Sequence, residues 1–320
     1  MDLDRLKRSM WLRQLYLKLK LPLEFPMILN IEPTNRCNLA CSFCPRKTSQ
    51  RPEYDLDWSL FLRLVAELKK EGPILRVFLQ KDGEPLLYAR LVEMVEILRK
   101  INAARVIAVI TNGVLLTEEK FLGLAAAGLD DLIVSIDANR AEDYKLLKGA
   151  DCYDKVVGNV LNAIHLKKKL GLIRPNIKVR MVERAGQQSE VKIFKKFWHG
   201  KADFVDITPF HTWLGAVDDE RCYNVTDRYP CSLLWYTGVV NSDGRVSPCC
   251  IDYDCAGCLD DLAGKSFREI WNGRSFNKLR RLHLLGKYHE TSICGPCEYW
   301  QIKENIGSWL KRKYRISSNE

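Results

Sequence analysis

The sequence predicts an α/β protein with two parts, a parallel strand–helix core and a smaller cysteine-rich unit at the C-terminal side. Short apolar runs of strand character alternate with longer amphipathic helical patterns from residue 27 to about residue 208, which is typical of parallel sheets. Beyond Thr208 the alternation stops, and eight of the twelve cysteines lie between about residues 209 and 300. With 320 residues the chain has room for one large domain or two ordinary ones.

Six strands are expected in the core, covering residues 27–32, 74–79, 105–110, 131–136, 176–182 and 204–208. The helical patterns between them cover residues 57–71, 87–101, 117–127, 140–170 and 187–199, with a break near Gly149. Strand–helix units of about 30 residues fit either a doubly wound sheet or a barrel. Periodicity alone does not choose between these two folds.

Three cysteines, Cys37, Cys41 and Cys44, lie in one short loop directly after the first expected strand. Iron–sulfur clusters are held by cysteine thiolates at such close spacings. Three ligands would leave one iron of a four-iron cluster open, and a reactive metal site keeps such an open position. The alternatives are a zinc site or three unrelated thiols.

The spacing Cys-x3-Cys-x2-Cys, with Phe43 just before the third cysteine, resembles the signature of the radical S-adenosylmethionine (SAM) enzymes. The resemblance implies that Cys37, Cys41 and Cys44 bind a [4Fe-4S] cluster whose open iron SAM chelates. One electron then cleaves SAM to methionine and a 5'-deoxyadenosyl radical. The resemblance also implies a partial (β/α)6 barrel, with the cysteine loop at the mouth where barrel enzymes place their chemistry.

The segment Lys81-Asp-Gly-Glu-Pro85 resembles the Gly-Gly-Glu-Pro motif of this family, and it implies that Gly83 and Glu84 contact the SAM amino group. Asp82 departs from the usual glycine. A lone Asp-Gly-Glu-Pro would be only a turn. By the same resemblance Ser135 and Lys148 are expected at the SAM carboxylate and Asp137 at the ribose. Phe43 and Asn112 complete the expected SAM contacts. Ordinary loop polarity is the alternative for Asn112, Ser135, Asp137 and Lys148.

In the C-terminal unit, Cys231-x12-Gly244-x4-Cys249 resembles the opening of the SPASM extension of radical SAM enzymes, and Cys294-Gly-Pro-Cys297 follows it. Asn241-Ser-Asp-Gly244 reads as a hairpin turn between residues 238–240 and 245–247. No further cysteine follows Cys297. The unit therefore resembles the shortened twitch form of 2-deoxy-scyllo-inosamine dehydrogenase-type proteins. This implies one auxiliary [4Fe-4S] cluster on Cys231, Cys249, Cys294 and Cys297, with a zinc ribbon as the alternative.

The remaining cysteines are interpreted separately. Cys222, Cys250, Cys255 and Cys258 are a less favoured set for a third cluster, and Cys152 reads as a small buried residue. Without a secretion signal, we expect reduced thiols in a cytoplasmic protein.

The net charge of +10 permits an anionic substrate or surface, and no basic, aromatic-rich stretch predicts nucleic-acid binding. Leu3 to Leu21 form a basic amphipathic helical pattern, for which packing on the barrel is favoured over membrane contact. We expect this helix in residues 1–26, the radical SAM core in 27–210, the auxiliary unit in 211–300 and a solvated basic tail in 301–320.

These features lead to a radical SAM oxidoreductase that dehydrogenates a small polar, carbohydrate-like substrate, with the auxiliary cluster as electron acceptor and a flavodoxin- or ferredoxin-type donor as partner. An epimerase in which Cys250 donates a hydrogen atom is the second hypothesis, and a peptide-modifying enzyme stays open. A zinc-stabilised binding protein without catalysis is the alternative from another class. We expect His211 to accept a proton, in a pocket lined by Glu183, Arg184, Asp206 and Trp213.

Overall fold

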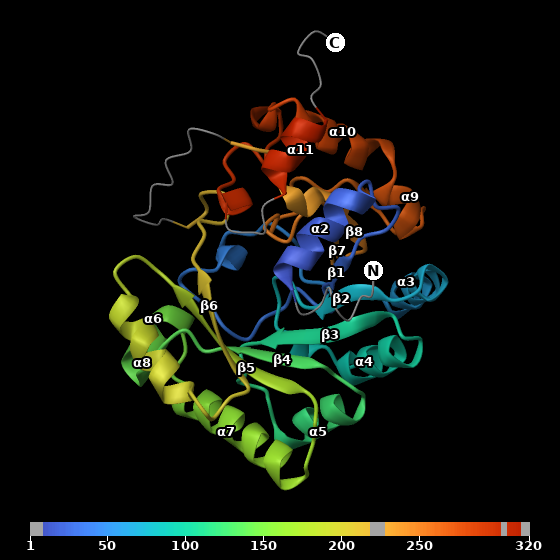
Figure 1. Ribbon diagram of the computed structural model, residues 1–320. Helices are drawn as coiled ribbons and strands as arrows, with labels where there is room; N and C mark the ends of the chain where they lie inside the picture. Colours follow the sequence, from blue (N-terminus) through green and yellow to red (C-terminus); the bar gives the residue numbers. More distant parts are fainter. Residues whose placement is uncertain (1–8, 218–227, 302–305, 315–320) are drawn as a thin grey trace.

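The computed structural model describes residues 9–217, 228–301 and 306–314, and these form a curved nine-stranded sheet covered by helices (Figure 1). The strand order is β6-β5-β4-β3-β2-β1-β7-β8-β9. Neighbouring strands from β6 through β1 to β7 are parallel. The first six strands are β1 (Ile28–Ile31), β2 (Ile74–Leu79), β3 (Ala104–Thr111), β4 (Asp131–Ser135), β5 (Asn176–Glu183) and β6 (Phe204–Pro209).

A helical segment follows each of the first five strands before the next strand begins. These helices are α3 (Trp58–Glu71), α4 (Leu91–Lys100), α5 (Glu118–Ala126), α6 (Ala141–Lys148), α7 (Tyr153–Lys169) and α8 (Gln188–Trp198). The expected α/β core and its six strands are therefore confirmed. The break in the fourth helical pattern is also confirmed, because Gly149 caps α6 with a φ of +71°, a conformation that favours glycine.

The sheet curves enough to bring together side chains from strands that are not neighbours. Arg76 on β2 pairs with Asp131 on β4 at 3.3 Å, although β3 lies between the two strands. Asp131 also accepts from Lys178 on β5 at 2.8 Å. These contacts place charged side chains inside the curve of the sheet, as a partial barrel requires.

The C-terminal unit continues the same sheet. Strand β7 (Thr237–Val240) runs parallel to β1, and β8 (Arg245–Ser247) and β9 (Asp260–Asp261) extend it in antiparallel fashion. The expected hairpin is thus confirmed. Because β7 pairs directly with β1, the two units share one sheet. The other elements of this unit are α9 (Phe267–Trp271), α10 (Arg274–Leu284) and the short helical turns η3 (Ser232–Trp235), η4 (Tyr288–Glu290) and η5 (Tyr299–Gln301).

The first and last helices that the structure describes meet in an apolar cluster beside the C-terminal unit. Helices α2 (Met10–Lys20) and α11 (Gly307–Lys313) lie close together, and Leu17 and Leu310 are buried there. The expected packing of the N-terminal helix is confirmed for Leu17 and Leu21, which are buried, but not for Met10, which is 56% exposed. The expectation of a solvated tail is wrong for Leu310, because α11 is amphipathic, whereas Lys311 to Lys313 are exposed. Among the described residues, no helix is long and apolar enough to cross a membrane.

Candidate functional site

The loop that carries Cys37, Cys41 and Cys44 is held against the end of α6 by backbone hydrogen bonds. The Ala40 N–H donates to the Lys148 carbonyl at 3.3 Å, and the Ser42 N–H donates to the Leu147 carbonyl at 2.8 Å. A Cβ on Gly149 would lie 2.8 Å from the Ala40 carbonyl oxygen. Gly149 is therefore required both for the turn and for the close approach of the cysteine loop.

The three thiols of this loop lie close enough to influence one another. Burial raises the pKa of all three, to about 12 for Cys44, and the neighbouring cysteines oppose the ionisation of Cys41 and Cys44. Three thiols that cannot readily ionise alone are favoured as thiolates once a cationic metal centre binds them. The donor set therefore fits an iron–sulfur cluster.

Glu84 lies in the segment that follows β2, and its buried carboxylate accepts three hydrogen bonds from the protein. Its Oε1 accepts from Leu86 N at 3.0 Å and Thr111 Oγ1 at 2.6 Å, and its Oε2 accepts from Asn112 N at 2.7 Å. Burial raises the pKa of this carboxyl, against those hydrogen bonds. Glu84 thus ties together the ends of β2 and β3 beneath the cysteine loop.

Gly83 lies against the backbone of the cysteine loop, where any side chain would collide with the Thr34 and Arg36 carbonyls. This packing lets the Glu84 N–H donate to the Arg36 carbonyl at 2.8 Å. Asn112 also reaches the loop, because its Nδ2 lies 3.9 Å from the Cys37 sulfur and donates to Asn38 Oδ1 at 2.8 Å. The motif after β2 and the end of β3 therefore converge on the cysteines.

Lys148 and Asp137 form a buried ion pair with each other. Burial alone would lower the pKa of Lys148, but the Asp137 carboxylate and then the Cys41 thiol raise it overall. The ammonium lies 5.3 Å from the Phe43 ring centre. Asp137 also accepts from Val182 N at 2.7 Å and has a φ of +65°. The structure thus brings together the expected residues Lys148, Asp137 and Phe43. Ser135 is the last residue of β4.

A cavity borders the Asp137 carboxylate of this ion pair. It has a volume of about 460 Å³, and its lining includes Ser42, Asp137 and Arg184. Arg184 is thereby placed beside the expected SAM contacts rather than with Asp206, which lines another cavity. The sequence does not predict this separation of Arg184 from Asp206, because a residue that follows a strand can face either of two neighbouring cavities.

A network of four buried charges joins the cysteine loop to the C-terminal unit. Arg51 pairs with Glu32 at 2.7 Å and with Asp82 at 3.0 Å, and Lys81 pairs with Asp82 at 2.5 Å. Glu32 also accepts from Ser242 N at 2.9 Å, in the turn between β7 and β8. Burial, and after it the Glu32 carboxylate, raises the pKa of Asp82 to about 7. Asp82, which stands in place of the motif glycine, is therefore part of the contact between the two units.

The four cysteines expected in the auxiliary site line one small, mostly apolar cavity. They are Cys231, Cys249, Cys294 and Cys297. Burial is the largest cause that raises the pKa of Cys231, Cys294 and Cys297. Four thiols around one cavity supply the full ligand set of a [4Fe-4S] cluster or of a zinc ion.

The same cavity is lined by three side chains with buried N–H groups that have no hydrogen-bond partner among the described residues. They are Arg228, His283 and Trp300, through Nε, Nε2 and Nε1. Leaving a buried donor unsatisfied costs about 1–3 kcal/mol, so three of them around four thiols indicate that an acceptor belongs there. Thiolate sulfurs are such acceptors in either kind of site, and an iron–sulfur cluster adds its sulfides as further acceptors.

A cavity of about 470 Å³ lies between the barrel strands and the C-terminal unit. Asn30 and Asp206 line it from the barrel, and Cys250 and Tyr299 line it from the C-terminal unit. The His211 ring lies 5.0 Å from the Tyr299 ring and 4.3 Å from the Trp213 ring. The structure therefore brings His211 next to this cavity through Tyr299. Glu183 ends β5, and Phe210 N donates to its carbonyl at 2.9 Å.

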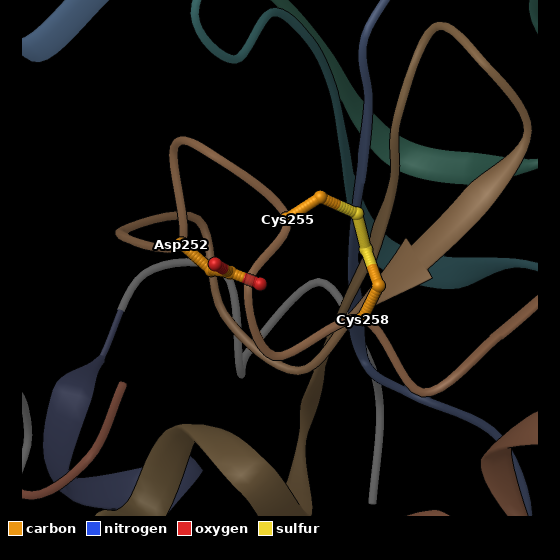
Figure 2. A group of neighbouring side chains, drawn as sticks. All are labelled: Asp252, Cys255 and Cys258. Carbon is orange, nitrogen blue, oxygen red and sulfur yellow. A yellow bond between two sulfur atoms is a disulfide. The ribbon is translucent and has the colours of Figure 1, made fainter. Parts of the chain in front are cut away.

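Cys255 and Cys258 are joined by a disulfide, next to the carboxylate of Asp252 (Figure 2). This pairing departs from the expected reduced thiols, and the tight turn brings the two Cα atoms to 5.0 Å. The two sulfurs and the Asp252 carboxylate also form a group that could hold a metal ion, so a third cluster that includes them stays a prediction. Cys222, from the same set, lies outside the described residues. Cys152 is half-buried against the Tyr144 hydroxyl at 3.8 Å.

Several site residues were missed at the sequence level, notably Asn30, Arg51, His283, Tyr299 and Trp300. Asn30 interrupts an apolar strand, and a polar residue on the inner side of a barrel strand is a usable signal. The others lie on segments whose neighbours in space are far away in the sequence. No local pattern points to them.

Comparison with known proteins identifies both units. Residues 31–182 match the radical SAM superfamily, and residues 231–298 match the SPASM iron–sulfur cluster-binding domain. The tungsten-containing aldehyde ferredoxin oxidoreductase cofactor-modifying protein of Pyrococcus furiosus is 28% identical over 48% of this chain and 43% of its own length. The GTP 3',8-cyclase of Synechococcus sp. is 34% identical over 50% of this chain and 49% of its own. The chain thus spans less than half the length of these curated relatives.

Solved structures share the fold. BtrN in complex with AdoMet and 2-DOIA has a TM-score of 0.58 at 20% identity, over 86% of this chain and 93% of BtrN. SuiB of Streptococcus suis bound to precursor peptide SuiA has a TM-score of 0.68 at 14% identity, over 92% and 76%. The expected fold class is confirmed. The expected cofactors follow from the two matched domains, which imply a [4Fe-4S] cluster with SAM and auxiliary iron–sulfur binding.

Proposed function

We propose, from the premise that the chain is a radical SAM protein with a SPASM domain, that it oxidises a small polar substrate bound between its two units. When bound, the cluster with SAM supplies a 5'-deoxyadenosyl radical for hydrogen abstraction, and the auxiliary cluster supplies an electron acceptor. Cys37, Cys41 and Cys44 would hold the first cluster. Cys231, Cys249, Cys294 and Cys297 would hold a single auxiliary cluster.

The observation that carries the proposal is the position of the 470 Å³ cavity. Barrel residues line one side of it, and Cys250, the neighbour of the expected ligand Cys249, lines the other. A substrate in this cavity would lie against the inner side of β1, β2 and β6, next to Cys250 of the C-terminal unit. An oxidised substrate carbon next to an electron acceptor favours dehydrogenation over a reaction without net electron loss.

The charges around the cavity favour an anionic or carbohydrate-like substrate. Arg13, Arg76 and Asp206 line it, together with the amide of Asn30. Burial, the Arg13 guanidinium and the Arg180 guanidinium act together to lower the pKa of Arg76, against the opposing effect of Asp131. A bound anion would relieve this crowding of positive charge. The amide and carboxylate would orient substrate hydroxyls.

Oxidation of the substrate also releases a proton, which needs an acceptor near the cavity. Asp206 lines the cavity directly, and its Oδ2 accepts two hydrogen bonds from Arg180, at 2.9 and 2.7 Å. His211 lies behind Tyr299. We assign proton acceptance to His211, with Asp206 holding the substrate hydroxyl. Asp137 and Arg184, which line the 460 Å³ cavity, would contact SAM together with Ser135 at the end of β4, and Lys148 would fix Asp137.

An epimerase is the second candidate, and one observation favours it. Cys250 lines the substrate cavity, where its thiol would return a hydrogen atom to the face opposite the abstraction. Turnover in deuterated water separates the two. Deuterium at the substrate carbon that disappears in Cys250→Ala supports epimerisation, whereas an oxidised product formed by Cys250→Ala and wild type alike supports dehydrogenation.

The substrate class is tested with the same assay. Phosphorylated and neutral carbohydrates, and a peptide panel, would be offered to anaerobically reconstituted protein with a flavodoxin- or ferredoxin-type reductant. We expect oxidised product from an anionic carbohydrate, and weaker turnover by Arg76→Gln. Turnover of a peptide alone would shift the proposal to peptide modification, for which SuiB bound to its precursor peptide is the structural precedent.

A further inference from the structure

The auxiliary cavity contains more polar groups than four cysteine ligands need. His283 is 1% exposed and Trp300 is 6% exposed. In the part of the chain that the structure describes, the His283 Nε2, the Trp300 Nε1 and the Arg228 Nε are each buried without a partner, and all three side chains line the cavity of the four cysteines. Three unsatisfied donors in one small apolar cavity would together cost several kcal/mol without an acceptor.

The remaining contacts of these side chains fix which atoms are left for the cavity. The Cys231 N–H donates to His283 Nδ1 at 3.2 Å, so this nitrogen carries no hydrogen and Nε2 is the protonated one. Arg228 donates from Nη1 to the Gly295 carbonyl at 3.1 Å and from Nη2 to the Cys294 carbonyl. The Trp300 ring is held edge-on against Tyr229, with ring centres 4.4 Å apart. All three donors are therefore positioned in advance by the segments that carry the cysteines.

We propose that His283, Trp300 and Arg228 donate N–H hydrogen bonds to the sulfurs of the auxiliary cluster and raise its reduction potential. Reduction adds a negative charge to the cluster, and N–H dipoles and a guanidinium stabilise the reduced form more than the oxidised one. The three side chains thereby act as positioning and tuning residues that favour acceptance of an electron. The inference rests on the auxiliary cluster of the proposed function and not on the identity of the substrate.

The experiment is an EPR-monitored potentiometric titration of full-length protein in which Cys37, Cys41 and Cys44 are Ala, so that only the auxiliary cluster contributes. Trp300→Phe removes one N–H and keeps a ring, and His283→Leu removes another. Each should shift the midpoint to more negative potential, by about tenfold in the equilibrium constant or about 59 mV for one electron. His283→Gln, whose amide can accept and donate, should recover part of the shift.

Trp271→Phe is the matched control. Trp271 is equally buried, but its Nε1 donates to the Leu23 carbonyl at 2.8 Å, away from this cavity. Its substitution should leave the midpoint unchanged. Pulsed EPR in deuterated water should also show exchangeable protons at the reduced cluster that are lost in Trp300→Phe.

Unchanged midpoints in Trp300→Phe and His283→Leu, at full iron content, would overturn the proposal. Loss of iron from both variants, while Trp271→Phe stays loaded, would overturn it as well, since the side chains would then retain the cluster rather than tune it. Absence of an EPR-active cluster from the parent protein would instead count against the auxiliary cluster itself.

Discussion

The two cysteine sites of this protein are built in opposite ways. Cys37, Cys41 and Cys44 lie in one loop and are held by backbone contacts to α6 and by the motif after β2. The four auxiliary cysteines come from three segments that span residues 231 to 297 and meet only through the fold. The first site is supported from below by a rigid barrel. The second site is enclosed by side chains whose buried N–H groups have no partner among the described residues.

This difference indicates that the two sites have different roles. A loop at the mouth of the barrel leaves one side of its metal centre accessible, as a site that binds a reactant must. A cavity closed by four thiols and apolar side chains excludes a reactant and suits electron transfer. The predictions below test these roles by damaging one site at a time.

The largest effect is expected when Cys37, Cys41 and Cys44 are all changed to Ala. Iron should fall from about eight to about four atoms per chain, and formation of 5'-deoxyadenosine should fall to background, because only this loop leaves an open iron. Iron, sulfide and zinc analysis with chromatography of the nucleoside measures both. Cys152→Ala, which alters only a half-buried thiol beside Tyr144, is the control and should keep full iron.

Two results would contradict the first prediction. Stoichiometric zinc in the wild-type protein would replace both clusters by zinc sites. Complete loss of iron from the triple variant, with circular dichroism unchanged, would mean that the auxiliary cysteines bind no cluster by themselves.

The second prediction damages the other site. Cys294→Ala combined with Cys297→Ala should also leave about four irons, but it should retain uncoupled formation of 5'-deoxyadenosine while net oxidation of substrate is lost. The reason is that SAM binds only the loop cluster. Circular dichroism must show a folded protein. A folded double variant that makes oxidised product at the wild-type rate would remove the need for an auxiliary acceptor and favour the epimerase.

The third prediction concerns the buried charges that connect the two sites. Arg51→Gln leaves Glu32 and Asp82 with Lys81 alone, and breaking a buried ion pair costs about 3–5 kcal/mol. Lys145→Gln, which breaks an exposed pair with Asp151, should cost less than about 1 kcal/mol. Anaerobic denaturant titrations measure both. Equal stability of the two variants would show that the network does not hold the units together.

Much of the first site and little of the second could be foreseen from the sequence. Strand–helix alternation predicts the parallel core, because each strand is buried by the helix that follows it, and Gly149 marks the helix break. The cysteine loop is a local motif, so its spacing carries its chemistry. The pairing of β7 with β1 is not local, and no pattern in residues 237–240 distinguishes a parallel partner.

The polar contacts of the two sites could not be predicted either, because they also join residues that are far apart in the sequence. Lys148 and Asp137 were expected to reach SAM separately, but the structure pairs them, which follows only from the closeness of α6 to the end of β4. His283 and Trp300 are ordinary helix and loop residues in the sequence, and they become site residues only when α10 and η5 close the auxiliary cavity. Asp82 replaces the motif glycine in the sequence, and in the structure it is one of the buried charged residues that connect the two units.

The fourth prediction uses the pKa of Asp82, which burial raises to about 7. Between the unfolded value near 4 and about 7, the folded state binds more protons than the unfolded state, so stability falls as pH rises and levels off above about 7. Asp82→Asn removes this term. Compared with the variant, the wild type should lose up to about 1.4 kcal/mol per pH unit between pH 5 and 6, and about half as much per unit near pH 7. Parallel pH profiles of unfolding free energy would contradict it.

The last and smallest effect distinguishes contact from support at Glu84. Oε1 of this carboxylate already accepts two hydrogen bonds and Oε2 accepts one, so one acceptor position is left on Oε2 for the SAM ammonium. Glu84→Gln should weaken SAM binding by about 1.5–3 kcal/mol, as expected for loss of a charged hydrogen bond. Thr111→Val removes a donor to Oε1 but keeps the carboxylate charge, and it should cost only about 0.5–1.5 kcal/mol of SAM affinity. Equilibrium binding to reconstituted protein measures both, and equal losses would mean that Glu84 supports the cysteine loop without touching SAM.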